Sequence, residues 1–82
     1  MNEYTVKFFA RCPINGVRIE YTLTVENPAT ANRLLVEDLV DAVELLDRGM
    51  HEEIADQLHR VFGGRQTLIA DHHGVTIRTT RG

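Results

Sequence analysis

The segment from Tyr4 to Glu26 constrains the fold most, because two alternating stretches flank the dipeptide Asn15-Gly16. Asn-Gly in that setting is typical of a β-hairpin closed by a two-residue turn. Such a turn fixes the pairing, and a shift of one residue would move every side chain to the other face. The expected apolar-face pairs are Val6–Val25, Phe8–Leu23, Ala10–Tyr21, Cys12–Ile19 and Ile14–Val17, and the expected polar-face pairs are Thr5–Glu26, Lys7–Thr24, Phe9–Thr22 and Arg11–Glu20.

Two helices are expected after this hairpin. Asn27-Pro28 is a helix-start signal, with Thr30 as a second possible cap, and Gly49 after Arg48 predicts the end of the first helix. The second helix is predicted from about His51 to Phe62, where Gly63-Gly64 ends it. The spacing of three and four gives each helix one apolar stripe. The stripes comprise Leu35, Val36, Leu39, Val40, Ala42, Val43 and Leu46 in the first helix, and Met50, Ile54, Leu58, Val61 and Phe62 in the second.

A second hairpin is predicted from Gln66 to Thr80. Its turn lies in the run from Asp71 to Gly74, closed either by His73-Gly74 alone or by all four residues. Both possibilities place the same apolar set on one face and the same polar set on the other. The apolar set is Leu68, Ala70, Val75 and Ile77, and Ile69, Thr76 and Arg78 lie opposite.

Together these elements predict one α+β domain over residues 1–82 with the order β-β-α-α-β-β. Because each hairpin and each helix has one apolar side, the simplest solution has two layers. A four-stranded antiparallel sheet carries two antiparallel helices on one face, and its other face is open. The open face is expected to hold Thr5, Lys7, Thr22, Thr24, Thr76, Arg78 and Thr80, with Phe9 and Ile69 as apolar exceptions.

Composition limits the classes of function. The net charge is −3 and no dense Lys/Arg cluster occurs, which argues against nucleic acid as the partner. No apolar run approaches the ~20 residues of a membrane span, so no membrane association is expected. The chain has a single cysteine, which fits a reducing compartment, and the expected location is the cytoplasm.

Cys12 is the first candidate for chemistry. The run Cys12-Pro13-Ile14-Asn15-Gly16 is a Cys-Pro-x-x-Gly turn between strands. It resembles the hairpin that carries the nucleophilic cysteine in nitrile reductases of queuosine biosynthesis, members of the tunnelling-fold superfamily, whose unit is also β-β-α-α-β-β. Ile19 stands where those enzymes have an aspartate, and their Glu-x-Lys-Ser-x-Lys signature is missing. The resemblance therefore implies a shared architecture without nitrile reduction, and Cys12 is expected to be a small buried hydrophobe.

The remaining candidates are histidines and acids. Asp71, His72 and His73, alone or with His51 or His59, have types of side chain that bind zinc, but neighbours on a strand point opposite ways and His51 and His59 lack helical ligand spacing. A solvated turn is expected instead. The row Glu37, Asp41 and Glu44 is expected to be the solvent-facing side of the first helix. The chain has no serine, which excludes a Ser/His/Asp triad. No catalytic residue, cofactor or metal is predicted.

The leading functional hypothesis is a non-catalytic module that forms a homo-oligomer, most simply a dimer, or binds a protein partner through its sheet. Its expected contact residues are Phe9, Thr22, Ile69 and Thr76. The alternative follows from the resemblance: tunnelling-fold proteins assemble units into a barrel and bind purine- or pterin-like ligands between subunits. The two hypotheses predict different oligomeric masses.

Overall fold

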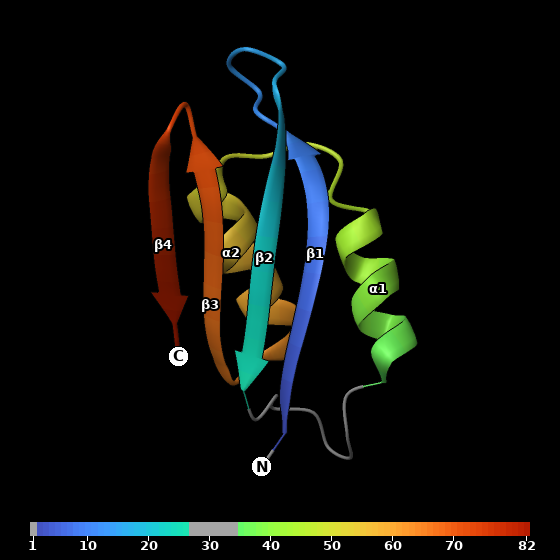
Figure 1. Ribbon diagram of the computed structural model, residues 1–82. Coiled ribbons are helices and arrows are strands. Elements are labelled where there is room, and N and C mark those ends of the chain that lie inside the picture. Colours follow the sequence, from blue (N-terminus) through green and yellow to red (C-terminus); the bar gives the residue numbers. More distant parts are fainter. Residues whose placement is uncertain (1, 27–34) are drawn as a thin grey trace.

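The protein is described by a computed structural model, which places residues 2–26 and 35–82. The elements are β1 (Glu3–Arg11), β2 (Arg18–Glu26), α1 (Val36–Glu44), α2 (His51–Phe62), β3 (Arg65–His72) and β4 (Val75–Arg81). The strands form one antiparallel sheet in the order β1-β2-β3-β4, with both helices on the same face (Figure 1). The predicted α+β architecture is confirmed, whereas the start signals at Asn27-Pro28 and Thr30 lie outside the described residues.

The core lies between the sheet and the two helices. Alternate residues of β1, β2 and β3 point toward the helices, and α1 packs near β1 while α2 packs near β3 and β4. The apolar side chains buried there remove a continuous surface from water, which is the main favourable term in folding. They are Phe8, Ala10, Ile19, Tyr21, Leu23, Val25, Leu39, Val43, Ile54, Ala55, Leu58, Phe62, Leu68 and Ala70.

The pairing predicted for the first hairpin is wrong by two residues. Phe8 lies opposite Tyr21 instead of Leu23, and Cys12 donates its backbone N–H to Val17 at 2.9 Å instead of pairing with Ile19. The loop is therefore longer than the predicted Asn15-Gly16 turn. Proline suits the second position of a type I turn, and Pro13 follows Cys12 directly.

The longer loop is stabilised by local hydrogen bonds. The Gly16 N–H donates to the Cys12 carbonyl at 2.8 Å, and the Val17 N–H donates to Oδ1 of Asn15 at 3.0 Å. Gly16 has a φ of 73°, a left-handed conformation that glycine adopts without steric cost. Ile14 is consequently an exposed loop residue rather than a partner of Val17.

A shift of two residues preserves the faces of the sheet, so the predicted separation of apolar and polar sides survives. The other predicted partners all change. On the helix side the pairs are Tyr4–Val25, Val6–Leu23, Phe8–Tyr21 and Ala10–Ile19, and on the open side they are Glu3–Glu26, Thr5–Thr24, Lys7–Thr22, Phe9–Glu20 and Arg11–Arg18.

The second hairpin takes the shorter of its two predicted turns. His72 pairs with Val75, so His73-Gly74 alone closes the hairpin. Both turn residues have positive φ, 54° for His73 and 84° for Gly74, as a type I′ turn requires. His72 therefore belongs to β3, and its prediction as a turn residue is wrong.

The first helix ends earlier than predicted. α1 stops at Glu44 instead of Arg48, and residues 45–50 form a link to α2. This link runs along the end of β1: the Arg11 N–H donates to the Asp47 carbonyl at 2.9 Å, and the Gly49 N–H donates to the Arg11 carbonyl at 3.2 Å. The link thus satisfies backbone groups at one end of the outer edge of β1.

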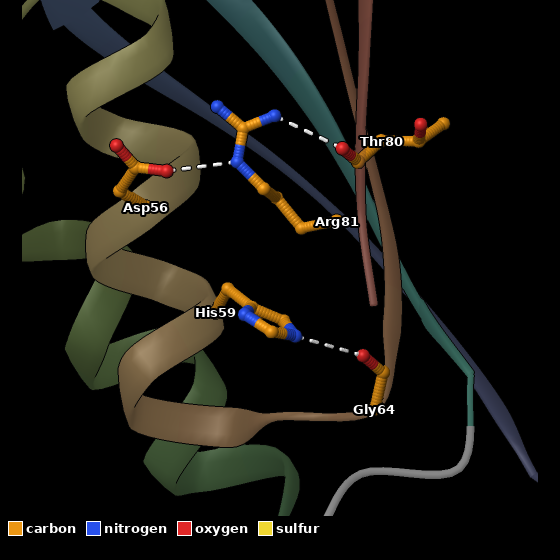
Figure 2. Close-up of polar contacts among 5 residues, drawn as sticks. All are labelled: Asp56, His59, Gly64, Thr80 and Arg81. Carbon is orange, nitrogen blue, oxygen red and sulfur yellow. Dashed lines mark hydrogen bonds and ion pairs between the residues drawn. The ribbon is translucent and has the colours of Figure 1, made fainter.

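Polar contacts fix α2 against the second hairpin. Figure 2 shows Arg81 of β4 and Asp56 of α2 pointing toward one another, with Nε of Arg81 donating to Oδ1 of Asp56 at 2.8 Å. His59 of α2 lies 3.1 Å from the Gly64 carbonyl through its Nε2 atom (Figure 2). α2 is therefore connected both to β4 and to the segment that leads into β3.

Candidate functional site

The outer edge of β4 is the first candidate site. β4 is an outermost strand of the sheet, and in the described part of the chain no other segment pairs with its outer side. Because the closing pair of a two-residue hairpin is hydrogen-bonded, the alternate residues Thr76, Arg78 and Thr80 direct their N–H and C=O groups away from β3. An edge of this kind is a template for pairing with another strand.

The two edges of the sheet are not equivalent. The outer edge of β1 is bridged at Arg11 by the link between the helices, and α1 lies beside β1 (Figure 1). β4 has no proline or lysine, and Arg81 is engaged with Asp56. Arg78 is the remaining charged side chain on this strand, so charge protects the β4 edge against pairing at only one position, and β4 is the less protected of the two edges.

The open face contains the four contact residues predicted from the sequence. Thr22 and Ile69 are direct cross-strand partners, and together with Thr76 they line a shallow hollow of 330 Å³. Phe9 is 45% exposed and lies under Arg18, whose guanidinium carbon is 3.8 Å from the ring centroid. The structure therefore brings Thr22, Ile69 and Thr76 together, whereas Phe9 forms a separate cation–π contact.

A second concave region lies on the helix side of the sheet. It has a volume of 450 Å³, and Cys12, His51 and His72 are among its lining residues. Nε2 of His72 lies 3.4 Å from Nδ1 of His51, although the two residues are 21 positions apart. The other residues of this histidine pocket are Gly49, Met50, Glu52, Ile77 and Thr79.

Three elements position the donor atoms of the histidine pocket. His51 is the first residue of α2, and His72 is the last residue of β3 on the face that also carries Leu68 and Ala70. Cys12 follows β1 and is half-buried against the core, so it is less buried than the sequence predicted. Sequence reasoning considered His51 as a possible partner of His72 but expected a solvated turn, although strand parity with Leu68 places His72 on the helix side.

The surroundings shift the pKa values of His51, which lines the histidine pocket, and of Tyr21, which lies beside it. Burial lowers the pKa of His51, and the nearby His72 lowers it further, against smaller raising effects from the Leu68 backbone and the Glu52 carboxylate. Burial raises the pKa of Tyr21, and Cys12 adds to this effect. The Tyr21 ring lies against both histidines, with centroid distances of 5.5 Å to His51 and 6.1 Å to His72.

Unpaired polar atoms mark the same region. Among the described residues, three buried side-chain atoms have no hydrogen-bond partner: Oη of Tyr21, Nε2 of His51 and Oε1 of Gln66. Buried polar atoms of native proteins are nearly always paired, so each exception calls for an explanation. Two of the three belong to His51, which lines the histidine pocket, and to Tyr21, whose ring lies against His51.

The other candidates have structural explanations. Glu37, Asp41 and Glu44 are all exposed on α1, as expected for its solvent-facing side. His73 lies in the turn with Nε2 at 3.1 Å from Nδ2 of Asn15, so it connects the two hairpin loops. Asp71 is exposed on the open face of β3.

Two findings concern the described residues as a set. No three His, Cys, Asp or Glu side chains within residues 2–26 and 35–82 form a ready-made metal-ligand group. No helix of these two segments has the length and apolar character needed to cross a membrane.

Comparison of the chain with protein-family models, with curated proteins and with solved structures finds no match to any of them.

Proposed function

We propose that this chain is a non-catalytic binding module that associates with a second copy of itself through the edge of its sheet. The observation that carries the proposal is the unpaired outer side of β4, which extends over Val75–Arg81. Pairing two such edges satisfies a row of backbone N–H and C=O groups on both partners. A protein partner with an extended strand would use the same groups.

Side chains favour one register for two β4 strands in antiparallel, two-fold pairing. Centring the pair on Arg78 would place like charges directly opposite, which is unfavourable. Centring it on Ile77 instead places Ile77 opposite its copy and Val75 opposite Thr79 of the copy. Val75 is 63% exposed in the single chain, and burial of such a side chain contributes about 1.5–3 kcal/mol.

Sedimentation of wild type beside two variants of one residue tests the proposal. Arg78→Pro removes an outward N–H without breaking the hydrogen bonds to β3, because proline is tolerated on edge strands. Arg78→Thr is the matched control, since it removes the charge and keeps the N–H. We expect dimeric wild type, a dimer of equal or higher affinity for Arg78→Thr, and monomeric, folded Arg78→Pro.

A monomeric wild type at all concentrations would refute self-association. Dimers that persist in Arg78→Pro would refute the β4 edge as the contact. A larger ring-like assembly would favour the alternative that the sequence resemblance implies, a tunnelling-fold-like protein that binds a purine- or pterin-like ligand between subunits.

A further inference from the structure

The histidine pocket borders the strand edge through which the chain is proposed to associate. Ile77 and Thr79 of β4 line this 450 Å³ pocket, and both side chains are half-buried on the helix side of the sheet. Because β4 is the outermost strand, no described segment pairs beyond these two residues. A strand that pairs with β4 would therefore extend the wall of the pocket.

The register centred on Ile77 determines which side chains a second copy brings to this wall. It places Ile77 of the copy opposite Ile77, and Val75 of the copy opposite Thr79. Since the outward backbone groups belong to the residues between them, both are non-hydrogen-bonded pairs, whose Cα atoms lie only about 4.5 Å apart. Alternate residues of a strand share one face, so Val75 and Ile77 of the copy lie on the pocket side. Two apolar side chains thus cover the outer side of a pocket that contains two histidines.

The His51–His72 pair is the part of this pocket that responds to pH. Nε2 of His72 and Nδ1 of His51 lie 3.4 Å apart in a hydrogen bond, which needs one N–H donor and one lone pair. Histidine has an unperturbed pKa of about 6.5, so mild acid adds positive charge to the pair. Apolar cover from a second copy takes water away from that charge, which is unfavourable. The neutral pair is therefore the form that suits the closed pocket.

The groups around the pair do not reverse this preference. Burial lowers the pKa of His51, and the neighbouring His72 lowers it further. β4 has no Asp, Glu or His over Val75–Arg81, so the strand pairing itself does not titrate in mild acid. The other groups near the pair are the Leu68 backbone and Glu52 of α2, which raise the pKa of His51, Arg81 of β4, which lowers it and is bound to Asp56, and Tyr21 of β2 and Cys12 after β1.

We infer that mild acid dissociates the dimer, because the two copies close each other's histidine pockets and a protonated His51–His72 pair opposes that closure. This regulation rests on the proposed association through the β4 edge. A two-fold dimer contains two such pockets, so its formation releases protons from both copies. The affinity is then highest where the pair is neutral and falls as the pH decreases.

Sedimentation of the full chain at about pH 8 and about pH 5.5 tests the inference. We expect the dissociation constant of wild type to rise at least about fivefold at the lower pH. His72→Gln removes one titrating ring and keeps a side chain that can hydrogen-bond to His51, and it should reduce this rise to less than about twofold. His73→Asn is the matched control, because His73 lies in the turn outside the pocket and its removal should preserve the response of wild type.

The outcomes separate this inference from the proposed association. A folded dimer with the same dissociation constant at both pH values, or an undiminished response in His72→Gln, would overturn the regulation and leave the β4 contact intact. A wild type that is monomeric at both pH values would refute the association and the regulation together.

A second measurement avoids acid unfolding of the chain. Dilution calorimetry near pH 6.5, in two buffers of different ionisation enthalpy, counts the protons taken up when the dimer dissociates. We expect net uptake by wild type and a smaller uptake by His72→Gln. A count of zero for wild type would overturn the inference by itself.

Discussion

At the scale of single residues, Gln66 shows how one buried side chain joins a helix end to the sheet. It is 2% exposed, and its Nε2 atom donates to the Leu58 carbonyl at 3.1 Å and to the Gly63 carbonyl at 2.8 Å. Gly63 follows the last residue of α2, where backbone carbonyls have no partner from a further helical turn. The Gln66 amide, on the second residue of β3, supplies a donor to the Gly63 carbonyl and a further donor to the Leu58 carbonyl.

Gln66→Glu should therefore destabilise the protein. Glutamate has the same shape but replaces the donor with a carboxylate, which removes the hydrogen bonds to both carbonyls and buries a charge beside them. We expect the free energy of unfolding to fall by at least about 1–3 kcal/mol in urea denaturation. Gln57→Glu, on the exposed side of α2, is the matched control, and an equal effect of both changes would contradict the role of the Gln66 amide.

His72 and Cys12 show which side-chain positions the sequence does not determine by itself. The parity of β3 places His72 with Leu68 and Ala70, so its inward direction is accessible from the sequence. Its contact with His51 depends on where α2 begins relative to the end of β3, which no local spacing encodes. Cys12 was assigned to a strand face, but the loop that starts there leaves it half-buried at a pocket.

At the scale of elements, hydrophobic periodicity predicts which helices and strands form and which of their faces are buried. It predicts less well how the strands pair. α2 has the predicted bounds, and the second hairpin has one of its two predicted turns. The first hairpin is shifted by two residues, because apolar alternation has a period of two and is satisfied equally well by both registers. The early end of α1 reflects a tertiary contact, since residues 45–50 hydrogen-bond to Arg11.

The contact between α2 and β4 gives an element-scale prediction of pH dependence. The hydrogen bond from Arg81 holds the pKa of Asp56 below its ordinary value. A carboxyl whose pKa is lower in the folded state adds stability above its unfolded pKa of about 3.9, and this is lost as the pH falls through the folded value. The contribution is small, because Asp56 is exposed and screened by solvent.

Asp56→Asn should consequently unfold slightly more easily than wild type at neutral pH, and the difference should vanish below the pKa of the folded carboxyl. Thermal unfolding at a series of pH values measures it, and added salt should reduce the neutral-pH difference. Asp41→Asn, an exposed change on α1, is the control. A difference between wild type and Asp56→Asn that is constant from neutral to strongly acidic pH would argue against the ion pair.

At the scale of the whole molecule, the sheet has two unlike edges and one open face. One end of the β1 edge is bridged by the helix link, whereas the outer side of β4 is unpaired in the described part of the chain. The open face is mostly threonine and charge, and its exposed Phe9 is covered in part by Arg18. We therefore propose that association uses the β4 edge and not the open face.

Substitutions on the open face should leave association intact. Phe9→Lys and Ile69→Lys add charge to that face without changing the backbone of β4. We expect both variants to sediment with the mass of wild type. A monomeric Phe9→Lys or Ile69→Lys variant that remains folded would transfer the contact from the β4 edge to the open face.

The most direct measurement is amide hydrogen exchange along β4 as a function of protein concentration. Edge pairing centred on Ile77 predicts that the outward amides of Thr76 and Arg78 exchange slowly in the dimer and quickly on dilution. The inward amides of Ile77 and Thr79, which bond to β3, should be protected at every concentration. Fast exchange at Thr76 and Arg78 in a chain that sediments as a dimer would contradict association through the β4 edge.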